Sequence, residues 1–351
     1  MKPFENLTYA GQVNRLRRLA VKALADYDLQ EVHLTALPHS ENTNFRIDLA
    51  TEERYVLRIH RPNLKAEDAV RSEMMWLASL RQETDLVVPE PIPTRDGNLL
   101  TVAGIEEVPE MRICVLFRWI PGRFFDDKLT PSHLERVGKF MARLQLYGAQ
   151  FRRPDVFVRG RLDTLTDKAR HVAGRGSSEA LVRQQIDNPT DEAAAIRVVS
   201  EICSKEDGER VSTLIKMMRE VQQAVGQGPD TFGLIHGDLH QENYLFHQGD
   251  VRVIDFDDCG FGYYLYDLAV TLSEVNWREN TPALRRGLLD GYRSVRELSP
   301  QHEQYLDIFI AFRDLQLMIY NIEMRAHPAF RAGWASSVKE MLKDLKNFVE
   351  G

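Results

Sequence analysis

The segment IHGDLHQEN at residues 235–243, followed by IDFDD at residues 254–258, is the feature that most limits how this chain can fold. Gly237 and the apolar, β-like residues before it exclude a regular helix across the first stretch. The intervening sequence YLFHQGDVRVI predicts two β-strands joined at its QGD tripeptide. Such a hairpin returns Asp255 to the edge where Asn243 lies, so we expect these two side chains to be neighbours.

The residue types in this segment are those of a phosphoryl-transfer site. In a catalytic loop, an aspartate such as Asp238 can orient an attacking hydroxyl and accept its proton. Asn243 offers a neutral oxygen ligand and Asp255 a charged one, and Mg²⁺ favours a few protein oxygens completed by water and phosphates. Each short motif alone, HGD or IDF, is usually structural. Their combination at this spacing favours a site that supplies a base, a metal ion and positioning.

The first 120 residues predict a small α+β unit. Apolar residues recur with helical period in two stretches, and alternate with polar residues in others. TEER predicts the turn of a β-hairpin, and RDGN at residues 95–98 predicts a second hairpin turn. The predicted helices are residues 10–28 and 66–82, and the predicted strands are residues 44–50, 54–60, 88–93 and 111–120.

Helices dominate the sequence after Pro121-Gly122. The predicted helices are residues 131–149, about 191–204, 208–225, and most of the chain from residue 266 onward. We therefore expect a small α+β lobe over residues 1–120 and a mainly helical lobe over residues 121–351. A helical insertion over about residues 150–230 is either a lid that sets specificity or a solvated helical pair.

The net charge, the cysteines and the apolar runs of the sequence indicate which partners and which cellular compartment to expect. A net charge of -7 and a pI of about 5.9 give no basic nucleic-acid footprint. Cys114, Cys203 and Cys259 are odd in number and far apart, so neither a disulfide framework nor a zinc site is expected. No apolar run reaches the length of a membrane span. We expect a cytoplasmic monomer or homodimer without a nucleic-acid or membrane partner.

The stretch HGDLHQEN…VIDFDDCGFGYYLYDLA resembles the signature of the aminoglycoside phosphotransferase family, which is related to choline, fructosamine and homoserine kinases and more distantly to protein kinases. The resemblance covers about residues 30–150 and 230–345, and is nearest to the homoserine kinase and stress-response kinase branches. It implies an α+β, bilobal, protein-kinase-like fold with a small β-rich lobe that binds nucleotide and a larger helical lobe that carries catalysis and substrate. It also implies that Asp238 is the catalytic base and that Asn243 and Asp255 are Mg²⁺ ligands.

The resemblance assigns supporting roles to residues around this centre. His236 and Asp267 are implied to brace the catalytic loop, although an N-cap on the following helix fits Asp267 equally well. Asp257 and Asp258 either add to the metal or substrate site or are solvated turn residues.

The resemblance also implies a nucleotide side. Arg58 in YVLR stands where related kinases carry a phosphate-binding lysine, and Glu73 on the helix over residues 66–82 is its implied partner. The alternatives are a surface arginine on an edge strand and a solvated glutamate. Ser40, Asn42 and Asn44 lie in a stretch without the usual glycines, PHSENTNF, and are the candidate phosphate contacts. Phe117 and Trp119 are the candidate adenine contacts, with a core position as the alternative for Trp119.

By this resemblance the protein transfers the γ-phosphate of ATP, with Mg²⁺, to a hydroxyl of a small molecule. Amino alcohols, hydroxy amino acids, sugars and aminoglycosides are the acceptor classes left open. A protein Ser/Thr kinase of the stress-response type, a nucleotide-binding scaffold without turnover and a metal-dependent hydrolase are the alternatives. Arg313 and Asp314, charged residues on a mainly apolar predicted helix, are either residues at the boundary of its apolar face or candidates for the lining of the acceptor pocket.

Overall fold

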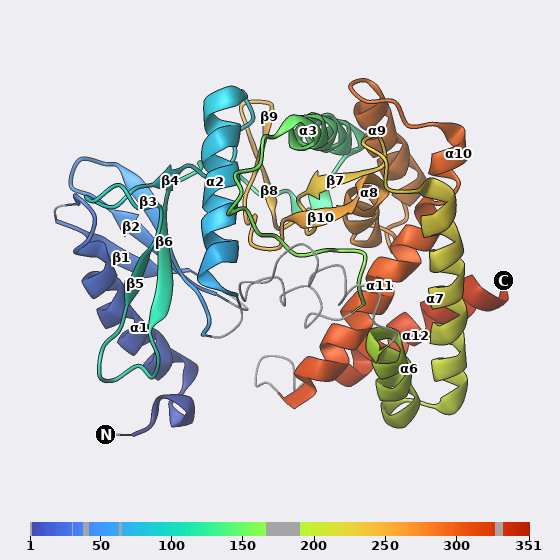
Figure 1. Cartoon of the computed structure of the whole chain (residues 1–351), viewed down its shortest axis with the longest axis horizontal. Helices are drawn as coiled ribbons and strands as arrows, with labels where there is room; N and C mark the ends of the chain where they lie inside the picture. Colours follow the sequence, from blue (N-terminus) through green and yellow to red (C-terminus); the bar gives the residue numbers. More distant parts are fainter. Residues whose placement is uncertain (1, 30, 38–41, 63–64, 166–189, 327–332) are drawn as a thin grey trace. The chain divides into compact units, whose positions relative to one another are not determined.

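The computed structural model describes residues 2–29, 31–37, 42–62, 65–165, 190–326 and 333–351. The chain divides into two compact units, one of Met1–Pro121 with Pro154–Val158 and one of Gly122–Arg153 with Arg159–Gly351. A β-sheet dominates the first unit and helices dominate the second (Figure 1). The separate functions expected of residues 1–120 and 121–351 stay predictions.

The first unit is built on an antiparallel sheet with strand order β1-β2-β3-β6-β4, in which β5 also pairs with β6. Its strands are β1 (His33–Ala36), β2 (Thr43–Asp48), β3 (Arg54–Ile59), β4 (Pro91–Ile92), β5 (Thr101–Ala103) and β6 (Arg112–Arg118), and its helices are η1 (Phe4–Asn6), α1 (Tyr9–Leu24) and α2 (Glu67–Glu83). Leu19 of α1 packs in one apolar cluster with Phe45 and Leu57 of the sheet. Because side chains alternate along β3, Arg58 points to the opposite face, where it contacts Glu73 of α2.

The predicted hairpin between residues 44–50 and 54–60 is confirmed, with Asn44 directly opposite Arg58. The RDGN turn also forms, because Thr94 N donates to Asn98 O over 2.8 Å. The strands beside this turn, β4 and β5, nevertheless each pair with β6 instead of with each other. The reason is length, since β6 runs from Arg112 to Arg118 and its edge has room for both short strands.

The second unit is mainly helical. Its helices are α3 (Pro131–Gln150), α6 (Thr190–Ile202), α7 (Lys205–Val225), α8 (Tyr264–Ser273), α9 (Thr281–Arg293), α10 (Pro300–Glu303), α11 (Leu306–Glu323) and α12 (Trp334–Glu350), with the short turns η2 (Asp126–Lys128) and η4 (Met324–Ala326). Two antiparallel strand pairs join β7 (Phe232–Ile235) to β10 (Gly260–Tyr263) and β8 (Tyr244–His247) to β9 (Asp250–Val253). None of the helices in the described ranges is both long and apolar enough to cross a membrane.

The helices predicted inside the 150–230 insertion are present as α6 and α7. They are not a solvated pair, because α7 buries Val211, Leu214 and Met218 and packs against α6, α11 and α12. An apolar stripe at helical spacing explains this packing, since it must be covered by other elements. Residues 166–189 of the insertion lie outside the described residues, so its role as a specificity element stays a prediction.

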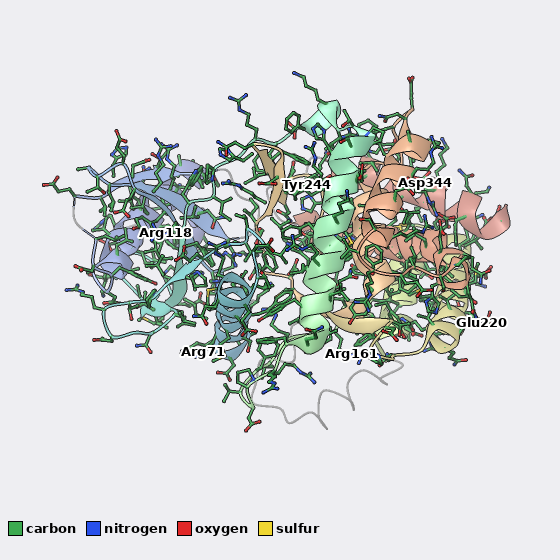
Figure 2. All side chains as sticks on the ribbon, turned by 90° about the horizontal axis from the view of Figure 1, so that it is seen from above. Arg71, Arg118, Arg161, Glu220, Tyr244 and Asp344 are labelled. Atoms are coloured by element: carbon green, nitrogen blue, oxygen red, sulfur yellow. The ribbon has the colours of Figure 1, made fainter. Side chains whose placement is uncertain are left out.

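Helices α3 and α9 cross with their backbones in close contact (Figure 2). Glycines make this possible: a Cβ on Gly138 would lie 2.1 Å from Leu288 O, and one on Gly287 would lie 2.3 Å from Pro131 O. A Cβ on Gly291 would likewise lie within 2.6 Å of the carbonyl carbon of Glu135. The crossing matters for the site because it carries Gln145 of α3 and Tyr292 of α9 into mutual contact.

Replacing Gly291 by alanine is expected to destabilise the protein by about 1–3 kcal/mol, even though alanine favours helices, because the added methyl meets backbone atoms that cannot swing away. Urea unfolding measures the change. The matched control is Gly228→Ala, whose Cβ would have its nearest neighbour 3.9 Å away and should change stability by less than about 0.5 kcal/mol. Equal stability of the two variants would contradict the close crossing.

Candidate active site

The loop over residues 236–243 leaves β7 through a conformation that only glycine accommodates. Gly237 has a φ of +82°, and a Cβ there would lie 2.5 Å from Leu162 Cδ1 and 2.8 Å from Asp258 O. The loop is not helical, as the sequence predicts. Its far end returns through the β8–β9 hairpin, in which Ile254 N donates to Asn243 O over 2.9 Å. The hairpin thus returns the backbone to Asn243 one residue before Asp255; contact between the two side chains stays a prediction.

Asp267 holds the start of this loop. Its carboxylate is fully buried and accepts from Gly237 N at 2.7 Å, from His236 N at 3.2 Å and from Gln145 Nε2 at 3.3 Å. Burial raises the pKa of Asp267, although the His236 ring and these donors oppose the effect. The alternative of an N-cap is wrong, because α8 begins at Tyr264 and already contains Asp267.

His236 holds the loop from the other side. Its Nδ1 accepts from Asp238 N at 3.3 Å, and its Nε2 lies 3.1 Å from Ile254 O on the strand that leads to Asp255. This assignment makes Nε2–H the donor to the carbonyl. The expected bracing by His236 and Asp267 is therefore present in the structure.

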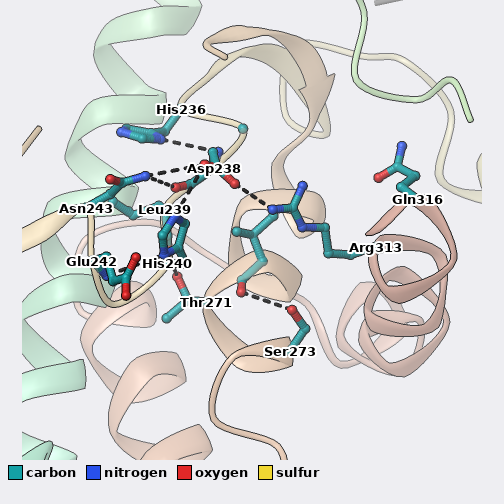
Figure 3. A network of polar contacts seen from close by, with 12 residues as sticks. His236, Asp238, Leu239, His240, Glu242, Asn243, Thr271, Ser273, Arg313 and Gln316 are labelled. Atoms are coloured by element: carbon teal, nitrogen blue, oxygen red, sulfur yellow. Dashed lines mark hydrogen bonds and ion pairs between the residues drawn. The ribbon is translucent and has the colours of Figure 1, made fainter. Parts of the chain in front are cut away.

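Asp238 lies at the centre of a polar network (Figure 3). Its Oδ1 accepts from Arg313 Nη2 at 2.5 Å, while its Oδ2 lies 3.3 Å from Asn243 Nδ2 and 3.4 Å from His240 Nε2. Burial would raise the pKa of Asp238, but the charge of Arg313 and the contact with His240 outweigh it and hold that pKa well below its usual range. Asp238 is thus an ionised hydrogen-bond acceptor at any physiological pH.

Sequence reasoning assigned no role to His240, although it lies only two residues after Asp238. Burial disfavours its protonation, but Asp238 and Glu274 outweigh burial and raise the pKa of His240. The loop around it is further fixed by Thr271, whose hydroxyl donates to Leu239 O over 2.7 Å. The spacing D-L-H was the available signal, but it does not show which way the ring points.

Asn243 and Asp255 present oxygens suited to a hard cation. The amide nitrogen of Asn243 donates to Asp238 O at 2.8 Å and approaches Asp238 Oδ2, so its Oδ1 is the atom left to act as a ligand. Asp255 is exposed and adopts a φ of +59°, a left-handed conformation that aspartate tolerates better than most residues. Among the described residues no cluster of three or more His, Cys, Asp or Glu side chains forms a metal cage. An amide oxygen and a carboxylate, completed by water and phosphates, are donors that Mg²⁺ accepts, and metal binding by these two residues stays a prediction.

Asp257 is not a solvated turn residue. It is buried, and its backbone carbonyl accepts a hydrogen bond from Arg159 Nη2 at 2.5 Å. Arg159 also donates from Nε to Cys259 O at 2.6 Å, which ties down the segment after β9. Asp258 is partly buried, and its charge acts on Arg313. A contact of either aspartate with metal or substrate stays a prediction.

In the first unit, Arg58 and Glu73 form a buried ion pair. Arg58 Nη1 lies 2.9 Å and 3.2 Å from the two carboxylate oxygens of Glu73, and the residues are 5% and 0% exposed. The guanidinium carbon also lies 4.9 Å from the centre of the Phe117 ring. The alternatives of an edge-strand arginine and a solvated glutamate are both wrong, because β3 is covered by β2 and β6 and by α2.

The other candidate nucleotide contacts are spread over the first unit. Asn42 is buried and its Oδ1 lies 3.4 Å from Arg61 N, whereas Asn44 lies in β2 opposite Arg58. Trp119 is not a core residue, because it is only partly buried, with the Arg46 guanidinium 6.0 Å from its ring centre. Ser40 lies outside the described residues. Nucleotide binding by these residues stays a prediction.

Asp314 lines a cavity of about 250 Å³ between α11 and α12. The cavity wall combines the carboxylates of Asp307 and Asp344 with apolar side chains such as Met318 and Leu345. Burial raises the pKa of Asp314 to about 7, an effect that the nearby charge of Arg313 opposes. Asp314 therefore lines a cavity, whereas its neighbour Arg313 contacts Asp238; that either residue lines the acceptor pocket stays a prediction.

Comparison with protein-family models gives one description. The model of the phosphotransferase enzyme family matches residues 33–304. Among curated proteins, the amicoumacin kinase of Bacillus subtilis is 21% identical over 347 residues, covering 95% of this chain and 91% of that protein. The hydroxylysine kinase of Bos taurus is 21% identical over 323 residues, covering 84% of this chain and 78% of that protein.

Solved structures resemble the whole chain. A microcompartment-associated aminopropanol kinase superposes with a TM-score of 0.71 at 26% identity, covering 95% of this chain and 98% of that one. An amicoumacin kinase in complex with AMP-PNP, Ca²⁺ and Ami superposes with a TM-score of 0.73 at 19% identity, covering 97% and 96%. These neighbours confirm the predicted α+β, protein-kinase-like fold.

Removing one partner of the Arg58–Glu73 pair should lower the free energy of unfolding strongly, whereas replacing both residues by apolar ones should lower it much less. Glu73→Ala removes the carboxylate that compensates a buried guanidinium and is expected to destabilise the protein by about 3–5 kcal/mol. The double variant Arg58→Met with Glu73→Leu removes both charges and should be clearly more stable than Glu73→Ala. Denaturant unfolding of the three proteins checks this. A double variant less stable than the single one would show that the charges themselves stabilise the unit.

The raised pKa of Asp314 predicts a loss of stability as pH increases. Between its ordinary value of 3.8 and about 7, the folded state binds more protons than the unfolded state, so the free energy of unfolding falls across this window. Asp314→Asn removes the titration and should exceed wild type by about 1–2 kcal/mol at pH 8, a value discounted for partial exposure, with no difference near pH 4. The exposed turn residue Asp250 provides the control Asp250→Asn. A difference that does not change with pH would contradict the shift.

Proposed function

The chain belongs to the phosphotransferase enzyme family and is a kinase, and we propose that it transfers the γ-phosphate of ATP, with Mg²⁺, to a hydroxyl of a small molecule. The relatives support a small-molecule acceptor, because they are named for amicoumacin, hydroxylysine and aminopropanol. Hydroxylysine and aminopropanol each combine an amine with a hydroxyl. Amino alcohols and hydroxy amino acids are therefore the first acceptor classes to test, before sugars and aminoglycosides.

The observation that carries this proposal is the state of Asp238. Its carboxylate is held by contacts on both oxygens, the charge of Arg313 keeps its pKa below the usual range, and its side chain is still 23% exposed. An ionised carboxylate can only accept hydrogen bonds, so an approaching acceptor hydroxyl must point its hydrogen toward Asp238. The oxygen lone pairs of the hydroxyl are then directed away from Asp238, toward an incoming phosphorus atom.

In the transfer, a bond forms between the acceptor oxygen and the γ-phosphorus, and the bond from that phosphorus to the β–γ bridging oxygen breaks. The acceptor proton moves to Asp238 and from there to water, and ADP leaves with the bridging oxygen. Because the pKa of Asp238 is low, we propose that Asp238 mainly orients the hydroxyl and takes its proton late, as the new bond forms. Such an order suits the loose transition state of phosphoryl transfer, which asks for little general-base help.

The remaining candidate residues receive supporting roles in this proposal. Asn243 and Asp255 hold Mg²⁺, which neutralises charge on the β- and γ-phosphate oxygens when bound. Arg58, fixed by Glu73, anchors nucleotide phosphate, with Ser40, Asn42 and Asn44 as further phosphate contacts and Phe117 and Trp119 as adenine contacts. The complex of an amicoumacin kinase with AMP-PNP and Ca²⁺ supports a nucleoside triphosphate and a divalent cation in this fold.

The test is ADP release in the presence of ATP and Mg²⁺ across a panel of amino alcohols, hydroxy amino acids, sugars and aminoglycosides. Wild type should release ADP with at least one acceptor class. Asp238→Asn should lower kcat by about 10²–10⁴-fold with that acceptor, because it removes the oriented carboxylate. The matched control Asp250→Asn lies on the exposed turn of the neighbouring hairpin and should retain wild-type activity.

If no acceptor in the panel causes ADP release although ATP still binds, a small-molecule acceptor is contradicted. A protein substrate or a non-catalytic scaffold would then be favoured. ADP release that needs no acceptor would instead favour hydrolysis. Repeating the active arm with GTP distinguishes the two nucleotides.

A further inference from the structure

Arg313 lies in the middle of α11, a helix that is otherwise mainly apolar, and it is only 6% exposed. Its Nη2 donates to Asp238 Oδ1 and its Nη1 donates to the Tyr266 hydroxyl at 3.3 Å. No hydrogen-bond acceptor for its buried Nε lies among the described residues. Burying a guanidinium with one donor unsatisfied is costly, and an apolar residue of similar volume would be cheaper. Stability alone therefore does not explain Arg313.

A second set of hydrogen bonds, made by Gln316 and Tyr266, fixes the position of Arg313. Gln316, one turn further along α11, donates from Nε2 to the carbonyls of Leu162 and Thr164, the former at 3.2 Å. Because carbonyls only accept, the amide of Gln316 must direct its Oε1 to the other side, where the Tyr266 hydroxyl donates to it at 2.7 Å. The lone pairs of the Tyr266 oxygen are then available to Arg313. In this series of hydrogen bonds, each group can act only as the donor or only as the acceptor toward its neighbour. The guanidinium of Arg313 therefore has one preferred position.

The two sides of Asp238 differ in accessibility. Arg313 reaches Asp238 from α11 (Figure 3). The side chain of Arg313 is 8% exposed, whereas the side chain of Asp238 is 23% exposed. A ligand hydroxyl can therefore reach Asp238 while Arg313 stays covered. Rotation of an aspartate carboxylate about its last bond is soft, so contacts with only Asn243 and His240 on Oδ2 would leave that angle loosely defined. The ion pair between Arg313 and Asp238 Oδ1 restricts this rotation.

We propose that Arg313 is a positioning residue of the transfer reaction, which holds the carboxylate of Asp238 in the orientation that receives the acceptor hydroxyl, and that Tyr266 and Gln316 hold Arg313. This inference rests on the proposed function of Asp238. Arg313 itself does not touch the reacting atoms. Misplacing a catalytic group by about 1 Å costs about 10²-fold in rate, which sets the size of the effect expected when Arg313 is lost.

The test is a double-mutant cycle on kcat, with the acceptor identified in the panel. Arg313→Met in the wild-type background should lower kcat by about 10–10²-fold and change the acceptor KM by less than about 3-fold, because it removes orientation and not binding. In the Asp238→Asn background the same change should cause no further loss, since the oriented carboxylate is already absent. Arg313→Lys keeps the charge without the fork geometry and should retain an intermediate kcat.

Tyr266→Phe provides a variant that leaves Arg313 in place. It removes the hydroxyl that accepts from Nη1 and should lower kcat less than Arg313→Met does, with the acceptor KM again unchanged. Thermal unfolding and ATP binding are measured for every variant. If Arg313→Met does not fold, Arg313→Lys and Tyr266→Phe complete the same cycle with Asp238→Asn.

Two results would overturn the inference while leaving the proposed function intact. A rise in acceptor KM at constant kcat would make Arg313 an acceptor-binding residue, and an equal loss of kcat in both backgrounds would show that Arg313 does not act through Asp238. A wild-type protein without acceptor-dependent ADP release would overturn the proposed function, and the positioning role with it.

Discussion

The buried carboxylate of Asp267 is the constraint on which the loop over residues 236–243 depends. A fully desolvated carboxylate must be met by donors, and here two of them are the backbone N–H groups of His236 and Gly237. The third, Gln145, is itself held by the Tyr292 hydroxyl at 2.6 Å. That contact requires α3 and α9 to approach as closely as their glycines allow. The position of Asp238 thus depends on backbone contacts two helices away from it.

The features that the sequence predicted are those encoded within a few dozen residues. The β8–β9 hairpin follows from alternation around a turn, and it returns the backbone to Asn243 one residue before Asp255 without help from distant elements. The periodicity of apolar residues alone predicts the β2–β3 hairpin and α2. Arg58 and Glu73, which these elements carry, are only 15 positions apart in the sequence. For the same reason the short strand β1 was missed, since four residues carry too little pattern to distinguish it from a loop.

The features that the sequence did not predict are contacts between distant segments. Arg313 and Asp238 are separated by 75 positions, and Tyr292 and Gln145 by 147. A polar residue in an apolar helix indicates a partner but does not name it, which is why Arg313 was expected to line a pocket. Asp267 was open to an N-cap interpretation because α8 begins three residues earlier, at a tyrosine pair that offers no capping side chain. The periodicity of a sequence shows which side chains share a face of a helix or strand. Which other element packs against that face depends on the tertiary fold.

The two buried arginine–carboxylate pairs show how one interaction can serve two purposes. Glu73 is completely covered, and both of its oxygens face Arg58, so that pair can only hold an arginine in place. Asp238 pairs one oxygen with Arg313 while its side chain stays 23% exposed, which leaves room for the acceptor contact proposed above. The length of the ion pair does not distinguish these cases, because both contacts are short, 2.9 Å and 2.5 Å. The remaining exposure of the side chain does, and it is consistent with the proposed role of Asp238 in meeting an acceptor.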